Sequence, residues 1–252
     1  MNGRFAFLAP ACGAALFVVV WWIASALKLV DPVLLPSPLD SWRALLAGAA
    51  DGTLTHDFMK TLWRTLLSFL IALAFAVPLG IVLGASERLY RSIEFVIDFF
   101  RSTPASAMFP LFLVLFGVGE ATKVAVAAFG AGLVILFNVA YGVMQARKVR
   151  QLAARVMGAS RLRILLDVTL WESLPQTFVG MRSGVSLALV IVIVAEMFIG
   201  STDGLGQRVI NAQMIFDMPK MYATIFAAGA LGYGLNLLFM VLDRRFVHWG
   251  GK

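Results

Sequence analysis

Ala153-Ala154-Arg155-Val156-Met157-Gly158-Ala159-Ser160, followed further along by Leu174-Pro175, is a polar stretch set between two long apolar runs. A strongly basic internal loop in an otherwise apolar chain predicts a surface on which a partner docks. On charge alone, the simpler interpretation is a loop that only orients the chain in a membrane. The basic residues in and around this stretch are Arg147, Lys148, Arg150, Arg155, Arg161 and Arg163.

The composition indicates an integral membrane protein. Of the 252 residues, 60% are hydrophobic and 14% are charged, whereas soluble domains are about half apolar and about a quarter charged. We therefore expect an all-α membrane protein with a single transmembrane domain, residues 1–252, in contact with membrane lipid. The net charge of +7 does not indicate a nucleic-acid partner, because the basic residues cluster in loops that flank the apolar runs.

Residues suited to catalysis or metal binding are sparse. Cys12 is the only cysteine, which excludes an intrachain disulfide and a cysteine-based metal site. His56 and His248 lie far apart near the ends of apolar runs, where interfacial side chains are the ordinary interpretation. No nucleophile and base occur at a useful spacing, so the sequence predicts neither an enzyme nor a cofactor bound by this chain.

Six apolar segments are long enough to cross a membrane, which takes about 20 residues per helix. The third is interrupted by Pro104 and Pro110. The first also has the pattern of a cleaved signal peptide, with Arg4 before the apolar run and Ala24-Ser25-Ala26 after it. The length of this run and Trp21-Trp22 favour a retained helix. The six predicted transmembrane helices span about 5–27, 62–85, 93–116, 122–144, 177–199 and 222–242.

The distribution of basic residues predicts which loops face the cytoplasm. One set of loops includes both chain ends and residues 147–176, and the other set lies on the opposite side of the membrane. The first set carries more basic residues than the second. Arg64 is assigned to the second set. Because basic loops stay on the cytoplasmic side, both termini and residues 147–176 are expected in the cytoplasm. Residues 28–61 and 200–221 are expected on the outer side.

Proline and glycine positions predict local structure outside the basic loop. Ser37-Pro38 is expected to begin an amphipathic helix, about 39–46, that lies along the outer membrane surface. Gly80-x3-Gly84 and Gly180-x3-Gly184 are expected to let helices approach one another closely.

The basic loop is expected to form two helices. Residues 151–157 favour a short helix, Gly158 permits a tight turn, and a second helix then re-enters the membrane. Pro175 is expected in the first turn of the next membrane helix, where its missing N–H group has no cost.

This loop resembles the Glu-Ala-Ala loop of permease subunits of binding-protein-dependent ABC importers. Ala153, Ala154, Gly158 and Pro175 occupy positions of the family pattern, whereas Leu152 stands where the family has a glutamate. In the family, this segment is a coupling helix that sits in a groove on the ATP-binding subunit. The resemblance implies a coupling segment over about 147–176. Its ATPase-coupling residues are then Leu152, Ala153, Ala154, Gly158, Ala159, Ser160 and Pro175.

Further motifs extend the resemblance over most of the chain, toward the family branch of nitrate, sulfonate, bicarbonate and taurine permeases. The implied fold is a MetI-like, type I importer permease with six transmembrane helices and a core over about 57–245. The motifs are Leu35-Pro36-Ser37-Pro38, Ser68-Phe69 with Pro78-Leu79-Gly80, Arg101-Ser102-Thr103-Pro104, Phe109-Pro110-Leu111, Phe116-Gly117-Val118-Gly119, Ala195-Glu196-Met197 and Gly204-Leu205-Gly206.

The resemblance also implies a function and a set of partners. The chain would form the path of a small solute across the inner membrane of a bacterium, with an anion such as a sulfonate, nitrate, bicarbonate or taurine favoured by the resemblance. The family branch also includes carriers of neutral and cationic small molecules, and the net positive charge, which membrane topology explains, does not distinguish them. No G-x-x-x-x-G-K-[ST] loop occurs in the sequence, so two separate ATPase subunits would bind ATP and magnesium. A second copy of the permease, forming a homodimer, and a periplasmic or lipid-anchored substrate-binding protein would complete the importer.

Polar residues within the apolar runs are candidates for the solute path, because a charge inside a membrane is costly and faces protein or water. Arg182 lies five residues after the start of its predicted helix, so it is expected to be shallow and to reach the cytoplasmic surface. Glu196 is expected to contact the binding protein or an internal arginine. For the charged candidates, a structural ion pair is the simpler role. The candidates are Arg101, Ser102, Thr103, Asn138, Arg182 and Glu196.

Two other functions are compatible with so apolar a chain. A secondary transporter that needs no ATPase is the main alternative, but such carriers show paired halves with interrupted helices, and the sequence shows no such symmetry. A membrane-embedded enzyme would need histidine, aspartate or glutamate in a cluster, which the sequence does not provide.

Overall fold

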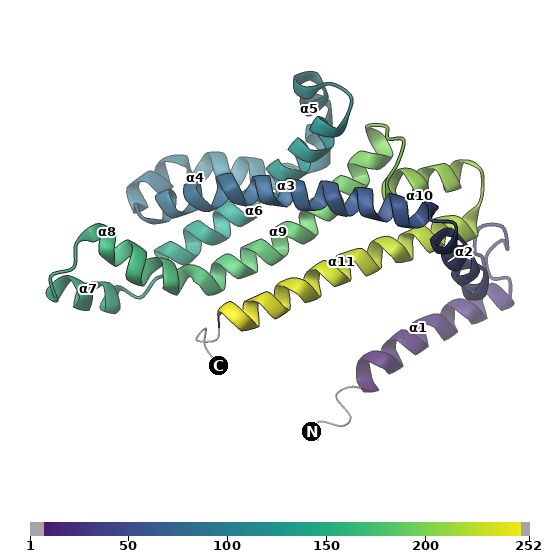
Figure 1. Ribbon diagram of the computed structural model, residues 1–252, viewed down its shortest axis with the longest axis horizontal. Helices are drawn as coiled ribbons and strands as arrows, with labels where there is room; N and C mark the ends of the chain where they lie inside the picture. The colour runs from purple at the N-terminus through teal and green to yellow at the C-terminus, as the bar shows by residue number, and fades with distance from the viewer. Residues whose placement is uncertain (1–7, 248–252) are drawn as a thin grey trace.

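The computed structural model describes residues 8–247, and in this range it consists of helices joined by loops, without a strand. The longest helices run along the long axis of the molecule (Figure 1). A 3-10 turn, Ala105–Met108, precedes α5, and a π-helical turn, Leu165–Thr169, precedes α9. The α-helices are α1 (Leu8–Ala26), α2 (Pro38–Ala50), α3 (Thr53–Gly84), α4 (Glu87–Ser102), α5 (Phe109–Phe116), α6 (Glu120–Met144), α7 (Lys148–Val156), α8 (Arg161–Ile164), α9 (Leu170–Phe198), α10 (Leu205–Met214) and α11 (Met218–Phe246).

Helix α6 packs against both α3 and α9 and forms the centre of the core. A Cβ atom added at Gly84 of α3 would lie 2.6 Å from the carbonyl oxygen of Ala140 on α6. A Cβ atom added at Gly184 of α9 would lie 2.7 Å from a side-chain carbon of Ile135, on another face of α6. Both glycine pairs therefore allow the close helix approach that the sequence predicts.

The apolar helices confirm a multi-pass membrane protein. Four stretches are long and apolar enough to cross a membrane: α3, α6, α11 and the helical run Arg161–Phe198 that ends with α9. A fifth is formed by α4 and Ala105–Phe116, which are bent by 94° relative to each other. The first predicted span, 5–27, corresponds to α1, and its apolar stretch Cys12–Ala26 is shorter than the other candidate spans. The number of six crossings therefore stays a prediction.

The bend between α4 and α5 lies at the first of the two prolines in the predicted third span. Thr103, directly before Pro104, has an extended backbone (φ −79°, ψ 125°), as a residue before proline prefers. Pro110 lies at the start of α5, where a proline is tolerated. The span over 93–116 is thus two helices at a steep angle.

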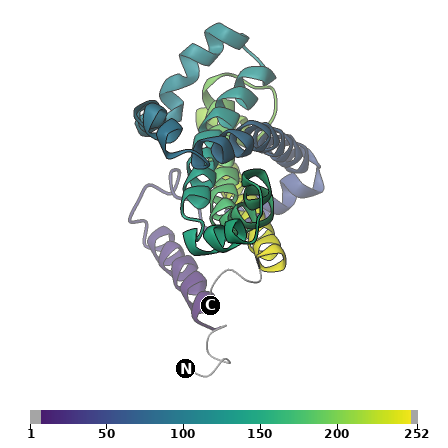
Figure 2. The same ribbon diagram turned by 90° about the vertical axis from the view of Figure 1, so that its left-hand side faces the viewer.

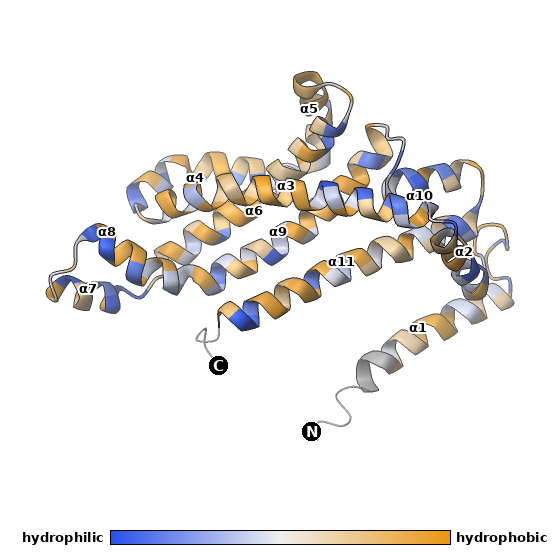
Figure 3. Ribbon diagram, viewed as in Figure 1, coloured by the Kyte–Doolittle hydropathy of each residue, from blue (hydrophilic) through white to orange (hydrophobic). Residues whose placement is uncertain are grey.

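The two ends of the bundle are more polar than its middle. Hydrophilic residues gather at α7 and α8 at one end and around α2 and α10 at the other (Figure 3). The end of α11 and the turn between α3 and α4 lie toward the α7–α8 end (Figure 1). Helix α1 lies beside the main bundle (Figure 2), which it contacts through the ring of Trp21 stacked on Tyr222 and Phe226 of α11.

Helix α2 begins where the sequence predicts. Ser37 is its N-cap, with a hydroxyl oxygen that accepts a hydrogen bond from the backbone N–H of Asp40 at 3.1 Å, and Pro38 is its first residue. The indole Nε1 of Trp21 donates to the carbonyl oxygen of Pro36 at 3.1 Å. This bond ties α1 to the start of α2.

Helix α9 begins earlier than the sequence predicts. The predicted start is residue 177 with Pro175 in the first turn, but α9 begins at Leu170 and Pro175 lies in its interior. The helical path starts earlier still, because Ser160 caps α8 and the turn Leu165–Thr169 leads directly into α9. Helix packing and polar side chains allow a proline inside a membrane helix. The prediction for the local position of Pro175 is therefore wrong.

Candidate coupling site and polar residues of the spans

The basic loop forms the two short helices that the sequence predicts. Helix α7 ends at Val156, and Gly158 adopts a left-handed conformation (φ +86°). The backbone N–H of Gly158 donates to the carbonyl of Arg155 at 3.0 Å, and that of Ala159 donates to the carbonyl of Ala154 at 3.0 Å. These two bonds form a Schellman motif, in which glycine takes the left-handed position at the lowest cost. Ser160 then caps α8.

One face of α7 is apolar and uncovered. The side chains of Val149, Leu152, Val156 and Met157 are 79%, 60%, 82% and 80% exposed. Their spacing of three, seven and eight residues from Val149 places them along one side of a helix. Ala153 is exposed between them. We name these five residues the apolar stripe of α7.

The remaining part of α7 is held against the start of α9. Glu172 accepts hydrogen bonds from the backbone N–H of Arg147 at 2.5 Å and from the guanidinium of Arg150 at 2.7 Å. The side-chain amide of Gln151 donates to the hydroxyl of Thr169 at 3.2 Å. The apolar stripe is therefore presented by a helix whose position is set by bonds to the rest of the bundle.

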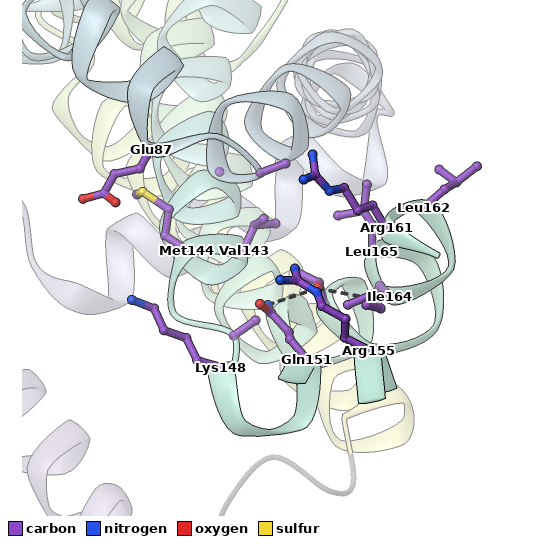
Figure 4. A pocket seen from close by; sticks show the side chains of 14 residues that line it. Glu87, Val143, Met144, Lys148, Gln151, Arg155, Arg161, Leu162, Ile164 and Leu165 are labelled. Atoms are coloured by element: carbon purple, nitrogen blue, oxygen red, sulfur yellow. Dashed lines mark hydrogen bonds between the residues drawn. The ribbon is translucent and has the colours of Figure 1, made fainter. Parts of the chain in front are cut away.

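A cavity of about 740 Å³ lies beside α7, between α7, α8 and the ends of α3 and α6 (Figure 4). Its lining includes the basic side chains of Lys148, Arg155 and Arg161 and one carboxylate, Glu87. An excess of positive charge suits acidic or polar side chains of another protein. The basic lining of this cavity and the apolar stripe lie on different sides of α7, at the same end of the bundle.

The predicted coupling residues divide between exposed and internal positions. Leu152 and Ala153 belong to the apolar stripe, and Gly158 and Ser160 are exposed in the turn and cap. The other members are partly covered: Ala154 lies in the last turn of α7, Ala159 lies in the turn that follows, and Pro175 lies inside α9. Their role in coupling remains a prediction.

At the opposite end of the bundle, a buried ionic cluster is centred on Arg64. The side chain of Arg64 is 2% exposed and lies in α3. Its guanidinium donates to Glu196 of α9 at 2.7 Å, to both oxygens of Glu120 of α6 at 2.6 and 2.7 Å, and to Asp203 in the loop before α10. One arginine thus joins three carboxylates from three parts of the chain.

Glu196 is fully buried in this cluster. Its carboxylate also accepts hydrogen bonds from the hydroxyl of Thr61 at 3.0 Å and from the backbone N–H of Gly206 at 2.8 Å. Of the two contacts expected for Glu196, the structure shows the one to an internal arginine. Its role in the solute path remains a prediction.

Arg64 is a residue that sequence reasoning missed, because it was grouped with the charges of the outer loops. The structure places it inside α3, which begins at Thr53. The signal was present, since residue 64 lies within the predicted span 62–85 and a charge inside a span points to a buried partner.

Further pairs extend the cluster toward the loop 199–204 and α10. Lys123 lies 3.1 Å from Glu120 and donates to the hydroxyl of Ser201 at 2.9 Å. Asp57 accepts from the backbone N–H of Gly204 at 2.9 Å and from Arg208 at 3.3 Å. The network therefore fastens α10 and the preceding loop to α3 and α6.

The pKa of Asp203, in the loop outside the spanning helices, lies below its ordinary value. Burial alone raises this pKa, but the hydrogen bond and charge of Arg64, together with the charge of Lys60, lower it by more. Lys60 lies 3.5 Å from the Asp203 carboxylate. Asp203 is therefore ionised in the folded protein at neutral pH.

Three of the path candidates lie at the end of α4. Arg101 forms an ion pair with Asp98 at 3.1 Å, and its guanidinium carbon lies 4.4 Å from the centroid of the Phe137 ring on α6. The hydroxyls of Ser102 and Thr103 donate to carbonyl oxygens of their own helix at 2.7 and 2.9 Å. All three residues stand directly before the bend at Pro104.

The other polar candidates are Asn138 and Arg182. Asn138 accepts from the side-chain amide of Gln176 at 2.8 Å, which links α6 to α9. Arg182 is exposed, and its Nε donates to the side-chain oxygen of Asn236 on α11. Because α9 begins at Leu170, Arg182 lies about 18 Å along the helix, and the expectation of a shallow position in the membrane stays a prediction.

Comparisons with known proteins place the chain in a family. Residues 76–249 match the family described as binding-protein-dependent transport system inner membrane component. The chain is 30% identical over 243 residues to the taurine transport system permease protein TauC of Escherichia coli, covering 94% of this chain and 88% of that protein. It is 28% identical to the bicarbonate transport system permease protein CmpB of Synechococcus elongatus, covering 96% of this chain and 87% of that protein.

A solved structure shares the fold. It shows the MetNI methionine ABC transporter in an inward-facing conformation, with a TM-score of 0.69 and 21% identity over 79% of this chain and 98% of that chain. The MetI-like fold and the family match agree with the arrangement of the basic loop and the spans. The chain belongs to the family of binding-protein-dependent transport system inner membrane components and is a permease subunit of an ABC importer.

Proposed function

We propose that this permease imports a small anionic solute, as a homodimer with two ATPase subunits and a substrate-binding protein. The names of the taurine and bicarbonate permeases that it resembles support an anionic or zwitterionic solute of low mass. The path would pass the polar residues of the spans, which are Arg101, Ser102, Thr103, Asn138, Arg182 and Glu196.

The observation that carries this proposal is the uncovered apolar stripe of α7. An isolated helix with four large apolar side chains facing water is unfavourable unless a partner covers them. ATP and magnesium would be bound by the partner ATPases, whose closure would move α7 and, through Glu172, the start of α9. Because Leu152 stands where the family has a glutamate, docking would depend on apolar contact and on the surrounding arginines.

The proposed orientation places α7, α8 and both termini in the cytoplasm of a bacterium and α2 and α10 on the outer side of its inner membrane. The concentration of basic residues at α7 and α8 supports this orientation. The binding protein would then approach the end of the bundle that holds α2 and α10.

Co-purification tests the proposal. A tagged permease, expressed with its partner ATPase, should retain that ATPase. Val156→Asp should reduce the retained amount, because it places a charge in the apolar stripe. Val118→Asp, at a residue that is 80% exposed in the loop between α5 and α6, is the matched control and should retain the ATPase. Equal retention by the wild type and Val156→Asp would contradict docking through α7.

A second experiment separates the importer from the alternative of a secondary transporter. The permease alone in liposomes should not take up solute when an ion gradient is imposed, whereas the complex with ATPase and binding protein should do so with ATP. Gly158→Leu should uncouple transport from ATP hydrolysis, because a branched side chain is strained at a φ of +86°. Gradient-driven uptake by the permease alone would overturn the proposal.

A further inference from the structure

Arg182 is an exposed cation within a spanning helix, and it has no carboxylate partner among the described residues. Arg64, Arg101 and Lys123 each lie within 4.0 Å of a carboxylate. Among the described residues, no carboxylate oxygen lies that close to Arg182, and its hydrogen-bond acceptor is the amide oxygen of Asn236. The positive charge of Arg182 is therefore not neutralised within the described part of the chain.

The position of Arg182 inside a spanning helix makes its charge costly in contact with lipid. Arg182 lies about 18 Å from the start of α9 and about 24 Å from its end at Phe198, inside a helical run that is long and apolar enough to cross a membrane. Its partner Asn236 lies about 12 Å along α11 from Arg244, the first basic residue at the end of that helix. A charge at this depth faces a polar or water-filled space rather than hydrocarbon.

Polar and small residues occur near Arg182 on α9 and near Asn236 on α11. Ser183 is exposed beside it on α9, and Ser186 lies one turn further. On α11, a Cβ atom added at Gly229 or Gly234 would meet nothing within 4 Å, and Tyr233 between them is 65% exposed. Hydroxyl-bearing residues therefore lie near Arg182 along α9, and small residues lie along the part of α11 that includes Asn236.

Asn236 holds the guanidinium but leaves most of its donors available. The bond to Asn236 uses Nε, and within the described residues the two terminal nitrogens of Arg182 have no hydrogen-bond partner. A guanidinium presents its donors in a planar fork that matches two oxygens of one anion. An amide partner orients this fork without cancelling its charge, as a carboxylate would.

We propose that Arg182, positioned by Asn236, is an anion-binding subsite of the solute path, and that it takes the sulfonate or carboxylate group of the solute. This inference rests on the proposed function, because it assumes that α9 and α11 line the path. It deepens that function by naming the atoms that would contact the anionic group. Asn236 is a positioning residue in this arrangement.

Uptake by the complete importer tests the subsite. The probe is radiolabelled ethanesulfonate, measured in proteoliposomes with ATP and saturating binding protein. Arg182→Gln should lower the uptake rate about tenfold or more, the loss expected for one charge-assisted contact. ATP hydrolysis stimulated by the binding protein should stay near the wild-type rate. Arg91→Gln, an exposed arginine at the start of α4, is the matched control and should leave uptake unchanged.

Asn236→Asp distinguishes anion binding from a structural role. The new carboxylate would pair with Arg182 and compete with the solute, so uptake should fall about as far as in Arg182→Gln. The melting temperature should not fall, since the pair becomes stronger. A structural role predicts the opposite result, namely normal uptake in Asn236→Asp.

The outcomes separate this inference from the proposed function. Wild-type uptake rates in both Arg182→Gln and Asn236→Asp would overturn the subsite, while ATP-dependent uptake of ethanesulfonate would still support the importer. If the wild-type complex took up neither ethanesulfonate, taurine nor bicarbonate, both the subsite and the anionic solute class would be overturned.

Discussion

Removing Arg64 should destabilise the permease more than removing its most buried partner, Glu196. Arg64→Gln would leave the Glu196 carboxylate, which is 0% exposed, without a cation among the described residues within 4.0 Å. The carboxylate of Glu196 would then accept hydrogen bonds only from the hydroxyl of Thr61 and the backbone N–H of Gly206 among the described residues. Leaving one charge of a buried pair uncompensated costs about 3–5 kcal/mol of unfolding free energy.

Glu196→Gln should cost less because Arg64 keeps two other carboxylates. Glu120 and Asp203 would still accept its hydrogen bonds. The expected loss is that of one hydrogen bond to a charged group, about 1.5–3 kcal/mol. The double variant should cost less than the sum of the single variants, since removing Glu196 abolishes the uncompensated charge that Arg64→Gln creates.

Unfolding of the purified full-length permease in detergent, followed by tryptophan fluorescence, measures these differences. Arg91→Gln is the matched control: Arg91 pairs with Glu87 at 2.6 Å, but both side chains are 72% exposed, so the loss should be about 0–1 kcal/mol. Equal losses for Arg64→Gln and Glu196→Gln, with strict additivity in the double variant, would refute the reasoning that Arg64 organises this cluster.

Three further perturbations have directions that follow from the structure. Gly84→Ala should lower the melting temperature of the permease, because the added methyl group would lie 2.6 Å from a carbonyl oxygen of α6, whereas Gly132→Ala should not, since its nearest neighbour would be 3.9 Å away. Leu152→Asp should weaken ATPase co-purification by placing a charge in the apolar stripe, and retention equal to the wild type would contradict this. The folded pKa of Asp203 lies below its unfolded value of about 3.9. The stability from this pKa difference is therefore complete above the unfolded pKa and is lost as pH falls through the folded pKa. Asp203→Asn should remove that part of the acid sensitivity, as measured by melting temperature against pH.

The sequence predicts the helical class, the membrane location and the local structure of the basic loop because each follows from neighbouring residues. Apolar runs of sufficient length predict α6 and α11, and Ser37-Pro38 predicts the start of α2. Small residues four positions apart predict the contacts of Gly84 and Gly184 with α6. These features depend on spacing along one chain segment, which the sequence displays directly.

Other features depend on contacts between distant segments and could not be derived in this way. Pro175 suggested a helix start, but the structure continues the helix through it. The angle of 94° between α4 and Ala105–Phe116 is not encoded by Pro104 alone, which predicts only an interruption. The partner of Glu196 is Arg64, 132 positions away. The sequence does not show which turn of α3 lies beside which turn of α9, so it does not predict this pair.

Packing along the bundle bears on how a displacement of α7 would reach the solute path. Glycine contacts join α6 to the last turn of α3, at Gly84, and to the middle of α9, at Gly184. At the opposite end of the bundle, Arg64 bonds to Glu120 and Glu196. At the other end, α6 leads into α7, and Glu172 of α9 accepts from Arg147 and Arg150. Because close-packed elements transmit strain, we expect these three helices to move as one body when α7 is pushed. The displacement of α7 would then also shift Arg182, which lies on α9. Helix α9 therefore connects the proposed docking surface to the proposed anion subsite.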